Sequence, residues 1–252
     1  MPDTPPLIFV AAVAAIFALG GFVKGVVGLG LPTIAMGLLS VLMLPAQAAA
    51  LLVVPSLVTN LWQIGGPGLV SLVTRIAPLL LGICAGAWIG AGWLTGAASS
   101  LAMLGLGIAL IAYAALGLLK WRFHVKPAHE ARLAPWIGLA TGLVTAATGV
   151  FVIPAVPYLQ ALGMEKEELV RALGLSFLVS TIALGAALGS SGALPTGALA
   201  ASGLALLPAL VGMSAGQWLR LRVRPESFKT IFFCGLLALG AYLTIRSALH
   251  AG

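Results

Sequence analysis

Charged residues are scarce in this chain. Asp, Glu, Lys and Arg make up 8% of its 252 residues, whereas an ordinary soluble domain has roughly 25%. Hydrophobic residues make up 61%, and the mean hydropathy is +1.13. A soluble fold of this size needs a polar surface that these residues cannot supply. The composition predicts an integral membrane protein of the multi-pass type and argues against a nucleic-acid partner, although the net charge is +7.

Acidic residues and metal-ligating side chains are missing from the apolar stretches. Mg²⁺ and Ca²⁺ favour carboxylate ligands, and proton relays in membranes use Asp, Glu or His. The two cysteines, Cys84 and Cys234, form no ligand spacing and imply no disulfide framework. We therefore expect no metal and no cofactor. The six acidic residues are predicted to lie in loops or near the N-terminus: Asp3, Glu130, Glu165, Glu167, Glu168 and Glu226.

Long apolar runs fill the rest of the chain, which is predicted to form a single transmembrane domain over residues 1–252. The runs cover 7–44, 46–63, 69–90, 101–119, 135–161, 172–190, 197–219 and 230–249. As one straight helix, the first run would be about 57 Å long, too long for a bilayer. Its centre is rich in Gly and Pro, which break helices, so two helical pieces with an unwound centre are expected. The first six residues contain no Lys or Arg, which predicts an anchored first segment rather than a cleaved signal peptide.

Two motifs recur in the second half of the chain. Gly21-x3-Gly25 returns as Gly138-x3-Gly142, and the motif that begins Pro78-x3-Gly82 returns as Pro208-x3-Gly212, with Ala, Gly and Trp following at matched positions. These matches predict internal repeats of approximately 1–123 and 124–252.

Basic residues distinguish two topologies. If all eight runs cross once, six basic residues fall on each side of the membrane. If 7–44 and 135–161 are broken, re-entrant hairpins, only Arg246 lies on one side, Lys24 lies within the membrane, and all the others share the second side. The positive-inside rule favours this asymmetry. The residues predicted to share a side are Arg75, Lys120, Arg122, Lys126, Arg132, Lys166, Arg171, Arg220, Arg222, Arg224 and Lys229.

The hairpin topology makes the two repeats inverted. Each repeat then holds one broken hairpin and three transmembrane helices, an odd number of crossings. Inverted repeats with interrupted helices that meet at the midplane are common among secondary transporters. The fold class predicted is an all-α polytopic membrane protein with two inverted-topology repeats.

Lys24 is the one charged residue deep in an apolar run. A charge there costs at least a few kcal/mol, so it usually has a partner or a function. Because no acidic residue lies in any apolar run, a substrate anion could supply the counter-charge. The alternative is that Lys24 extends to an interface or donates to carbonyls of the broken hairpin.

Small and polar residues at the hairpin tips and on two helix faces complete the candidate substrate-binding site. Free N–H groups at the start of a half-helix bind anions, and glycine lets the backbone approach a ligand closely. Ser56, Asn60 and Gln63 share a helix face, as do Ser176 and Ser180. Interhelical packing and hydrogen bonding are the alternative, and for Gly21 and Gly138 packing is the expectation. The predicted substrate-binding residues are Lys24, Gly28, Gly30, Thr33, Ser56, Asn60, Gln63, Thr145, Thr148, Gly149, Ser176 and Ser180.

No catalytic residues are predicted. Gly189-Ser190-Ser191-Gly192 matches the Gly-x-Ser-Gly of intramembrane serine proteases, which need a base beside the serine. The three histidines, His124, His129 and His250, are all expected outside the membrane. An intramembrane enzyme is therefore disfavoured. An assembly subunit without transport activity would leave the paired polar faces unexplained.

The segment Gly21-Phe-Val-Lys-Gly25-Val-Val-Gly28-Leu-Gly30, its echo at Gly138–Gly142 and the paired Pro-x3-Gly-x3-Gly helices resemble the sulfite exporter TauE/SafE family. The resemblance covers nearly the whole chain. It implies a transporter of small sulfur-containing anions, such as sulfite or sulfonates, in the plasma membrane.

Taken together, the residues and the resemblance predict a secondary transporter. Its substrate would be sulfite, a sulfonate or a related organosulfur or carboxylate anion, moved across the inner (plasma) membrane by alternating access. A passive anion channel is the alternative. The sequence leaves open whether a proton or Na⁺ is coupled to transport and whether the chain forms a homodimer.

Overall fold

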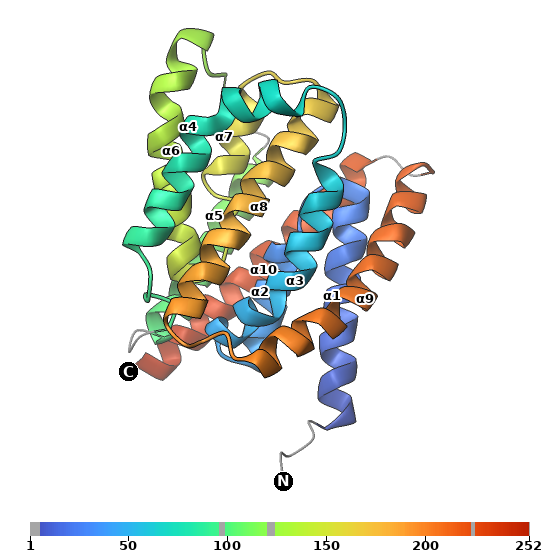
Figure 1. Cartoon of the computed structure of the whole chain (residues 1–252). Helices are drawn as coiled ribbons and strands as arrows, with labels where there is room; N and C mark the ends of the chain where they lie inside the picture. Colours follow the sequence, from blue (N-terminus) through green and yellow to red (C-terminus); the bar gives the residue numbers. More distant parts are fainter. Residues whose placement is uncertain (1–5, 96–98, 120–123, 223–224, 252) are drawn as a thin grey trace.

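The structure is a computed structural model that describes residues 6–95, 99–119, 124–222 and 225–251 (Figure 1). This part of the chain is helical, without strands. Its helices are α1 (Leu7–Val27), α2 (Leu31–Leu42), α3 (Pro45–Gln63), α4 (Leu69–Ile89), α5 (Ser99–Leu118), α6 (Pro127–Thr148), α7 (Ala155–Ala161), α8 (Lys166–Ser190), α9 (Thr196–Arg220) and α10 (Pro225–Ala251). Among the described helices, seven are long and apolar enough to cross a membrane. The predicted all-α polytopic membrane protein is confirmed.

The first apolar run is broken where glycine and proline predicted it. Gly28 ends α1 with φ +87°, and Gly30 precedes α2 with φ +119°. Residues other than glycine rarely adopt these φ angles. The chain then turns back along α1, since a Cβ built on Gly20 would lie 3.3 Å from the Leu31 carbonyl oxygen. The run from 7 to 44 therefore forms two helical pieces joined by an unwound centre, as predicted.

The second broken run begins earlier than predicted. Helix α6 starts at Pro127 instead of residue 135 and has 22 residues, which makes it about 33 Å long. The first two turns of α6 carry the charged residues Glu130 and Arg132. An apolar run excludes such residues, so hydropathy placed the start of this segment after them. The chain leaves α6 at Gly149 and continues without helix to α7.

Acidic residues also lie in helices instead of loops. Glu130 is in the first turn of α6, and Glu167 and Glu168 are in the first turn of α8. Carboxylates are favourable at the positive end of a helix dipole, so the polar cluster from 165 to 171 begins a helix where a break was predicted. Asp3 and the side chain of Glu226 lie outside the described residues.

Glycine stripes bring two pairs of helices into backbone contact. A Cβ built on Gly21 or Gly25 of α1 would overlap the backbone of α9, and one built on Gly82 or Gly86 of α4 would overlap the backbone of α6. Small residues allow this close approach in membranes. The packing predicted for Gly21 is therefore confirmed. Gly138 is confirmed in the same way, because a Cβ there would overlap the Leu79 carbonyl oxygen of α4.

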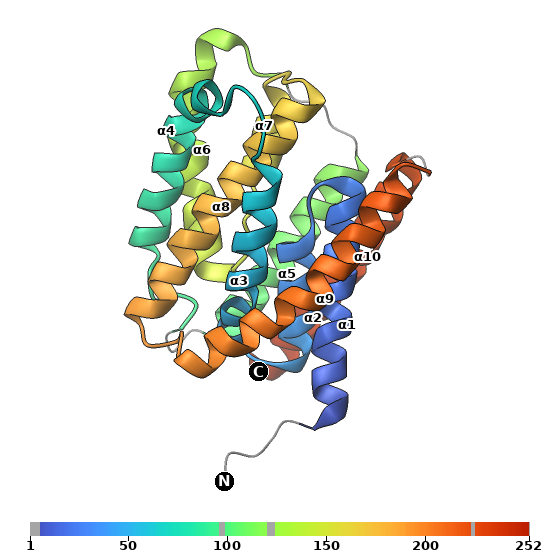
Figure 2. The same ribbon diagram turned by 45° about the vertical axis from the view of Figure 1, so that its right-hand side comes forward.

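Helices α3 and α8 lie between these two pairs. Figures 1 and 2 both place α4 and α6 on one side of them and α1 and α9 on the other. Helices α3 and α8 are antiparallel, because Gly174 near the start of α8 lies against Gln63 at the end of α3, and Gly185 lies against Val53. Ser56 and Asn60 are therefore level with the turns of α8 that carry Ser176 and Ser180.

A proline within α3 is accommodated by a serine of α9. Pro55 lacks the N–H that would bond the Leu51 carbonyl oxygen. Ser202 Oγ donates to that oxygen at 2.7 Å and accepts from the Val54 N–H at 3.0 Å. Ser202 is fully buried, so this contact fixes α9 on the polar-faced helix α3.

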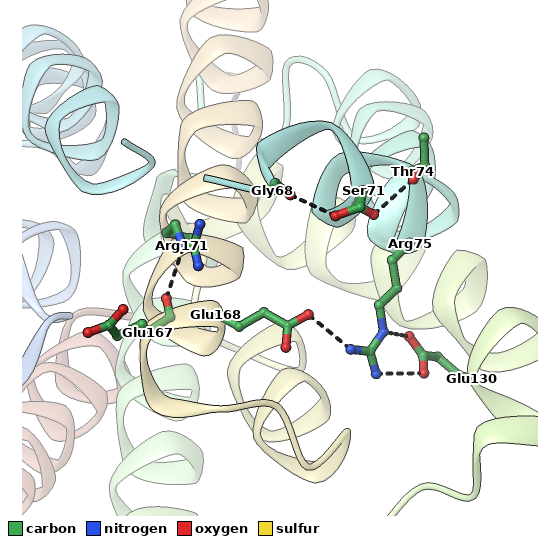
Figure 3. A network of polar contacts seen from close by, with 8 residues as sticks. All are labelled: Gly68, Ser71, Thr74, Arg75, Glu130, Glu167, Glu168 and Arg171. Carbon is green, nitrogen blue, oxygen red and sulfur yellow. Dashed lines mark hydrogen bonds and ion pairs between the residues drawn. The ribbon is translucent and has the colours of Figure 1, made fainter. Parts of the chain in front are cut away.

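The first turns of α4, α6 and α8 meet at the end of the bundle away from both termini (Figure 1). Arg75 of α4 donates to both Glu130 carboxylate oxygens, at 2.8 and 3.1 Å, and to Glu168 Oε1 at 3.1 Å (Figure 3). Arg171 donates to the Pro67 carbonyl oxygen in the loop before α4. We refer to Arg75, Glu130 and Glu168 as the Arg75 cluster.

The remaining described basic residues follow the arrangement that the hairpin topology predicts. Lys126, Arg132 and Lys166 lie at the starts of α6 and α8, beside the Arg75 cluster. Helix α9 packs parallel to α1, since Gly21 lies against Ala209 and Gly25 against Gly216, so the end of α9 is remote from the N-terminus. Arg220, Arg222 and Lys229 lie at this turn between α9 and α10. Lys120, Arg122 and Arg224 lie outside the described residues.

Candidate functional site

Lys24 lies in the last turn of α1 and is 3% exposed. Its ammonium group donates to Thr59 Oγ1 at 3.1 Å and to Asn60 Oδ1, both on α3. Both partners are neutral, whereas Glu130 and Glu168 pair with Arg75. The side-chain hydrogen bonds of Lys24 to described residues go to α3 and not to a carbonyl of the broken hairpin.

The helix dipole compensates only part of this charge. A cation in the last turn of a helix gains about 0.3–1 kcal/mol. Taking an ion out of water costs several kcal/mol even after the protein relaxes. The dipole therefore offsets only part of the cost of burying the Lys24 ammonium group, and the positive charge lacks a full counter-charge.

Gln63, the last residue of α3, joins three helices at the break. Its Nε2 donates to the Gly28 carbonyl oxygen and to the Val170 carbonyl oxygen of α8, each at 2.9 Å. The predicted polar face of α3 therefore lies against the unwound centre between α1 and α2.

Most of the predicted polar residues have a buried side-chain N or O atom without a hydrogen-bond partner among the described residues. Such groups cost about 1–3 kcal/mol each when left unsatisfied, so natural proteins keep few of them without a reason. The unpartnered atoms are Thr33 Oγ1, Ser40 Oγ, Ser56 Oγ, Asn60 Nδ2, Gln63 Oε1, Ser176 Oγ and Ser180 Oγ. All except Ser40 belong to predicted substrate-binding residues.

The start of α2 adds backbone donors to this region. Helix α2 has no side-chain cap, and Gly30 precedes its first turn. The first N–H groups of a helix have no intrahelical partner and form the positive end of its dipole. Thr33, which is fully buried, lies in this turn.

The second hairpin uses its predicted hydroxyl groups locally. Thr145 Oγ1 donates to the Thr141 carbonyl oxygen at 2.7 Å, and Thr148 Oγ1 donates to the Val144 carbonyl oxygen at 2.7 Å. No hydrogen bond between described residues joins this tip to Lys24. A Cβ built on Gly149, which has φ +71°, would clash with the Met36 side chain of α2.

Packing nevertheless places the unwound chain after α6 beside the site. Phe151, fully buried, lies against Phe177 of α8 with ring centroids 6.3 Å apart. Phe177 directly follows Ser176 in the chain. The second hairpin tip is thus near α8, which carries Ser176. Its predicted residues Thr145, Thr148 and Gly149 are not among the unpartnered groups of the candidate site.

Thr59 belongs to the candidate site and was not predicted from the sequence. It accepts from Lys24 and donates to the Pro55 carbonyl oxygen at 2.7 Å. The predicted face took residues at i, i+4 and i+7 from Ser56 and left out the i+3 position, which lies on the same side of a helix. A wider face would have included Thr59.

The chemistry of this group favours an anion. It offers one ammonium group, several hydroxyl groups, one amide N–H pair and a helix N-terminus. The buried residues of the described part include no carboxylate. Among the described residues, no three His, Cys, Asp or Glu side chains come together as a metal site.

Comparison with known proteins identifies a family. The model of the family described as sulfite exporter TauE/SafE matches residues 13–243. No curated protein and no solved structure matches the chain.

Proposed function

Because this chain belongs to the sulfite exporter TauE/SafE family, we propose that it is a secondary transporter that carries sulfite, a sulfonate or a related small anion across the plasma membrane by alternating access. Membership assigns membrane transport of sulfur-containing anions at the level of the family. The particular anion, the site and the mechanism are the proposal.

Lys24 is the observation that supports the site. Its ammonium group is buried with two neutral acceptors on α3. An ammonium group has three N–H donors, so one remains for a ligand. A bound anion would neutralise the charge and accept from the unpartnered hydroxyl groups.

Two inverted repeats would place this site between moving parts. Helices α1 to α5 and α6 to α10 follow one another in the same order, each set beginning with a long helix that a glycine ends. The recurring glycine motifs pack crosswise, α1 on α9 and α4 on α6. These contacts support pairs that contain one helix from each repeat, with the polar faces of α3 and α8 between them. Motion of one pair against the other would expose the site to one side at a time.

Replacement of Lys24 tests the proposal. We expect Lys24→Met to weaken sulfite binding to the purified protein about 10- to 100-fold, because a hydrogen bond to a charged group contributes about 1.5–3 kcal/mol. Lys24→Arg should retain part of the affinity. Lys229→Met, which removes an exposed lysine at the start of α10, is the control and should bind as the unmodified chain does. Equal affinity in Lys24→Met and the control would exclude Lys24 from the site.

Transport in liposomes separates a carrier from a channel. A carrier predicts saturable sulfite uptake that is accelerated by unlabelled sulfite on the opposite side. Flux that rises linearly with concentration and shows no such exchange would favour the passive channel.

A further inference from the structure

The hydrogen bonds of Gln63 determine which end of its amide is free. Its Nε2 faces two carbonyl oxygens, of Gly28 and Val170, which can only accept. The remaining atom, Oε1, is buried and has no partner among the described residues. Since an amide oxygen only accepts, Gln63 requires a donor from whatever occupies the site.

Asn60 has the opposite requirement one turn away. Its Oδ1 accepts from the Lys24 ammonium group, so its free atom is Nδ2, a donor. Side chains three residues apart on a helix are neighbours, with Cβ atoms about 5–6 Å apart. The face of α3 thus presents a donor beside Lys24 and an acceptor one turn nearer the end of the helix.

The single positive charge of Lys24 sets a second condition on the ligand, its net charge. Lys24 is the one charged side chain among the buried residues that the structure describes. One negative charge on the ligand would neutralise it, whereas a second would remain uncompensated in a low-dielectric region, at a cost of several kcal/mol.

We infer that the site selects a small oxyanion with one negative charge that carries its own hydrogen-bond donor, such as hydrogen sulfite or a hydroxyl-substituted sulfonate. This inference rests on the proposed function. The oxyanion would lie against Lys24 and Asn60 Nδ2, and its O–H group would donate to Gln63 Oε1.

Three sulfonates with the same two-carbon skeleton test the inference. Ethanesulfonate has one charge and no donor, 2-hydroxyethanesulfonate adds the donor, and 1,2-ethanedisulfonate replaces it with a second charge. By calorimetry on the purified full chain, we expect 2-hydroxyethanesulfonate to bind about tenfold more tightly than ethanesulfonate, since the donor satisfies a buried acceptor. The disulfonate should bind at least about tenfold more weakly than the hydroxyl compound.

A variant of Gln63 assigns the preference to its oxygen. In Gln63→Met, the affinity ratio of 2-hydroxyethanesulfonate to ethanesulfonate should fall to about one. Gln47→Met is the matched control, because Gln47 lies at the other end of α3, where its Oε1 accepts from the Leu44 N–H. This control should keep the ratio of the unmodified chain. The ratio compares two ligands on the same protein, so a general loss of stability does not change it.

The outcomes separate the inference from the proposed function. Equal binding of ethanesulfonate and its hydroxyl derivative to the unmodified chain, or undiminished binding of the disulfonate, overturns the inference. If sulfite binding still depends on Lys24, the proposed function stands in that case. If neither sulfite nor any sulfonate binds, both are overturned.

Discussion

At the scale of single residues, the buried hydroxyl groups are of two kinds: some donate to backbone carbonyl oxygens, and others have no partner among the described residues. Ser202, Thr145 and Thr148 use their hydroxyl groups to satisfy backbone carbonyl oxygens. Ser56 and Ser180 are equally buried and satisfy none. The first kind stabilises the helices, whereas the second marks the region that we assign to the substrate.

Ser202 provides a test of the first kind. Ser202→Ala should lower the free energy of unfolding by about 1–3 kcal/mol, because it leaves the Leu51 carbonyl oxygen buried without a partner. Thermal unfolding of the purified protein measures the change. Ser190→Ala, which removes a hydroxyl group at the exposed end of α8, should leave stability nearly unchanged. Equal effects of the two substitutions would contradict the role given to Ser202.

Several predicted residues of the candidate site lie together in the structure, but their hydrogen-bond partners were harder to predict. Helical spacing placed Ser56, Asn60 and Gln63 on one face, and the structure brings that face to Lys24 and Gly28. The acceptor Thr59 and the Val170 carbonyl oxygen were not predicted. A backbone carbonyl has no signal in the sequence, because any residue supplies one.

At the scale of helices, glycine determines how closely the elements approach. Gly212 of α9 faces the Ala18 carbonyl oxygen of α1, whereas a Cβ built on Gly203 of the same helix would have no atom within 4 Å. The same residue type therefore has two different roles within α9.

These two glycines form a matched pair of substitutions. Gly212→Ala should destabilise the protein by about 1–3 kcal/mol, because α1 and α9 must separate to admit the methyl group. Gly203→Ala should leave stability unchanged or raise it by up to about 1 kcal/mol, the helix-propensity difference between the two residues. Thermal unfolding of both variants gives the comparison. A stable Gly212→Ala variant would contradict the close contact of α1 with α9.

Helix breaks were predictable, but some helix starts were not. The density of glycine and proline between residues 25 and 32 predicted the break after α1. The starts of α6 and α8 lie in charged segments, where the apolar pattern ends although the helix continues. Hydropathy reports the part of a helix within lipid, and the remaining turns extend past it.

At the scale of the whole molecule, the basic residues suggest which end faces the cytoplasm. Both termini lie at the end opposite the Arg75 cluster (Figure 1). Under the positive-inside rule, the Arg75 cluster and the turn between α9 and α10 face the cytoplasm.

Cysteine labelling tests this topology. In a variant with Cys84 and Cys234 replaced by serine, Ala128→Cys and Arg222→Cys should react with an impermeant maleimide from the same side of the membrane. Ser191→Cys, in the turn after α8, should react from the opposite side. Labelling of positions 128 and 222 from opposite sides would restore the topology of eight single crossings.

The pairing of helices could not be predicted from the sequence. The motifs at Gly21 and Gly138 indicated close packing but not the partner helix. The structure places them on α9 and α4, each in the other half of the chain. Such a choice depends on how all the helices fill space together, and no single motif contains that information.

Because the Arg75 cluster lies at one end of the molecule, we expect the salt concentration on the two sides of the membrane to affect the protein differently. The Arg75–Glu130 and Arg75–Glu168 ion pairs lie at one end, where the Arg75 side chain is 36% exposed. Dissolved electrolyte weakens exposed charge pairs, with a Debye length of about 10 Å at 0.1 M. A rise in salt on that side alone would loosen the attachment of α8 to α4 and α6, while the same rise on the far side would leave it intact.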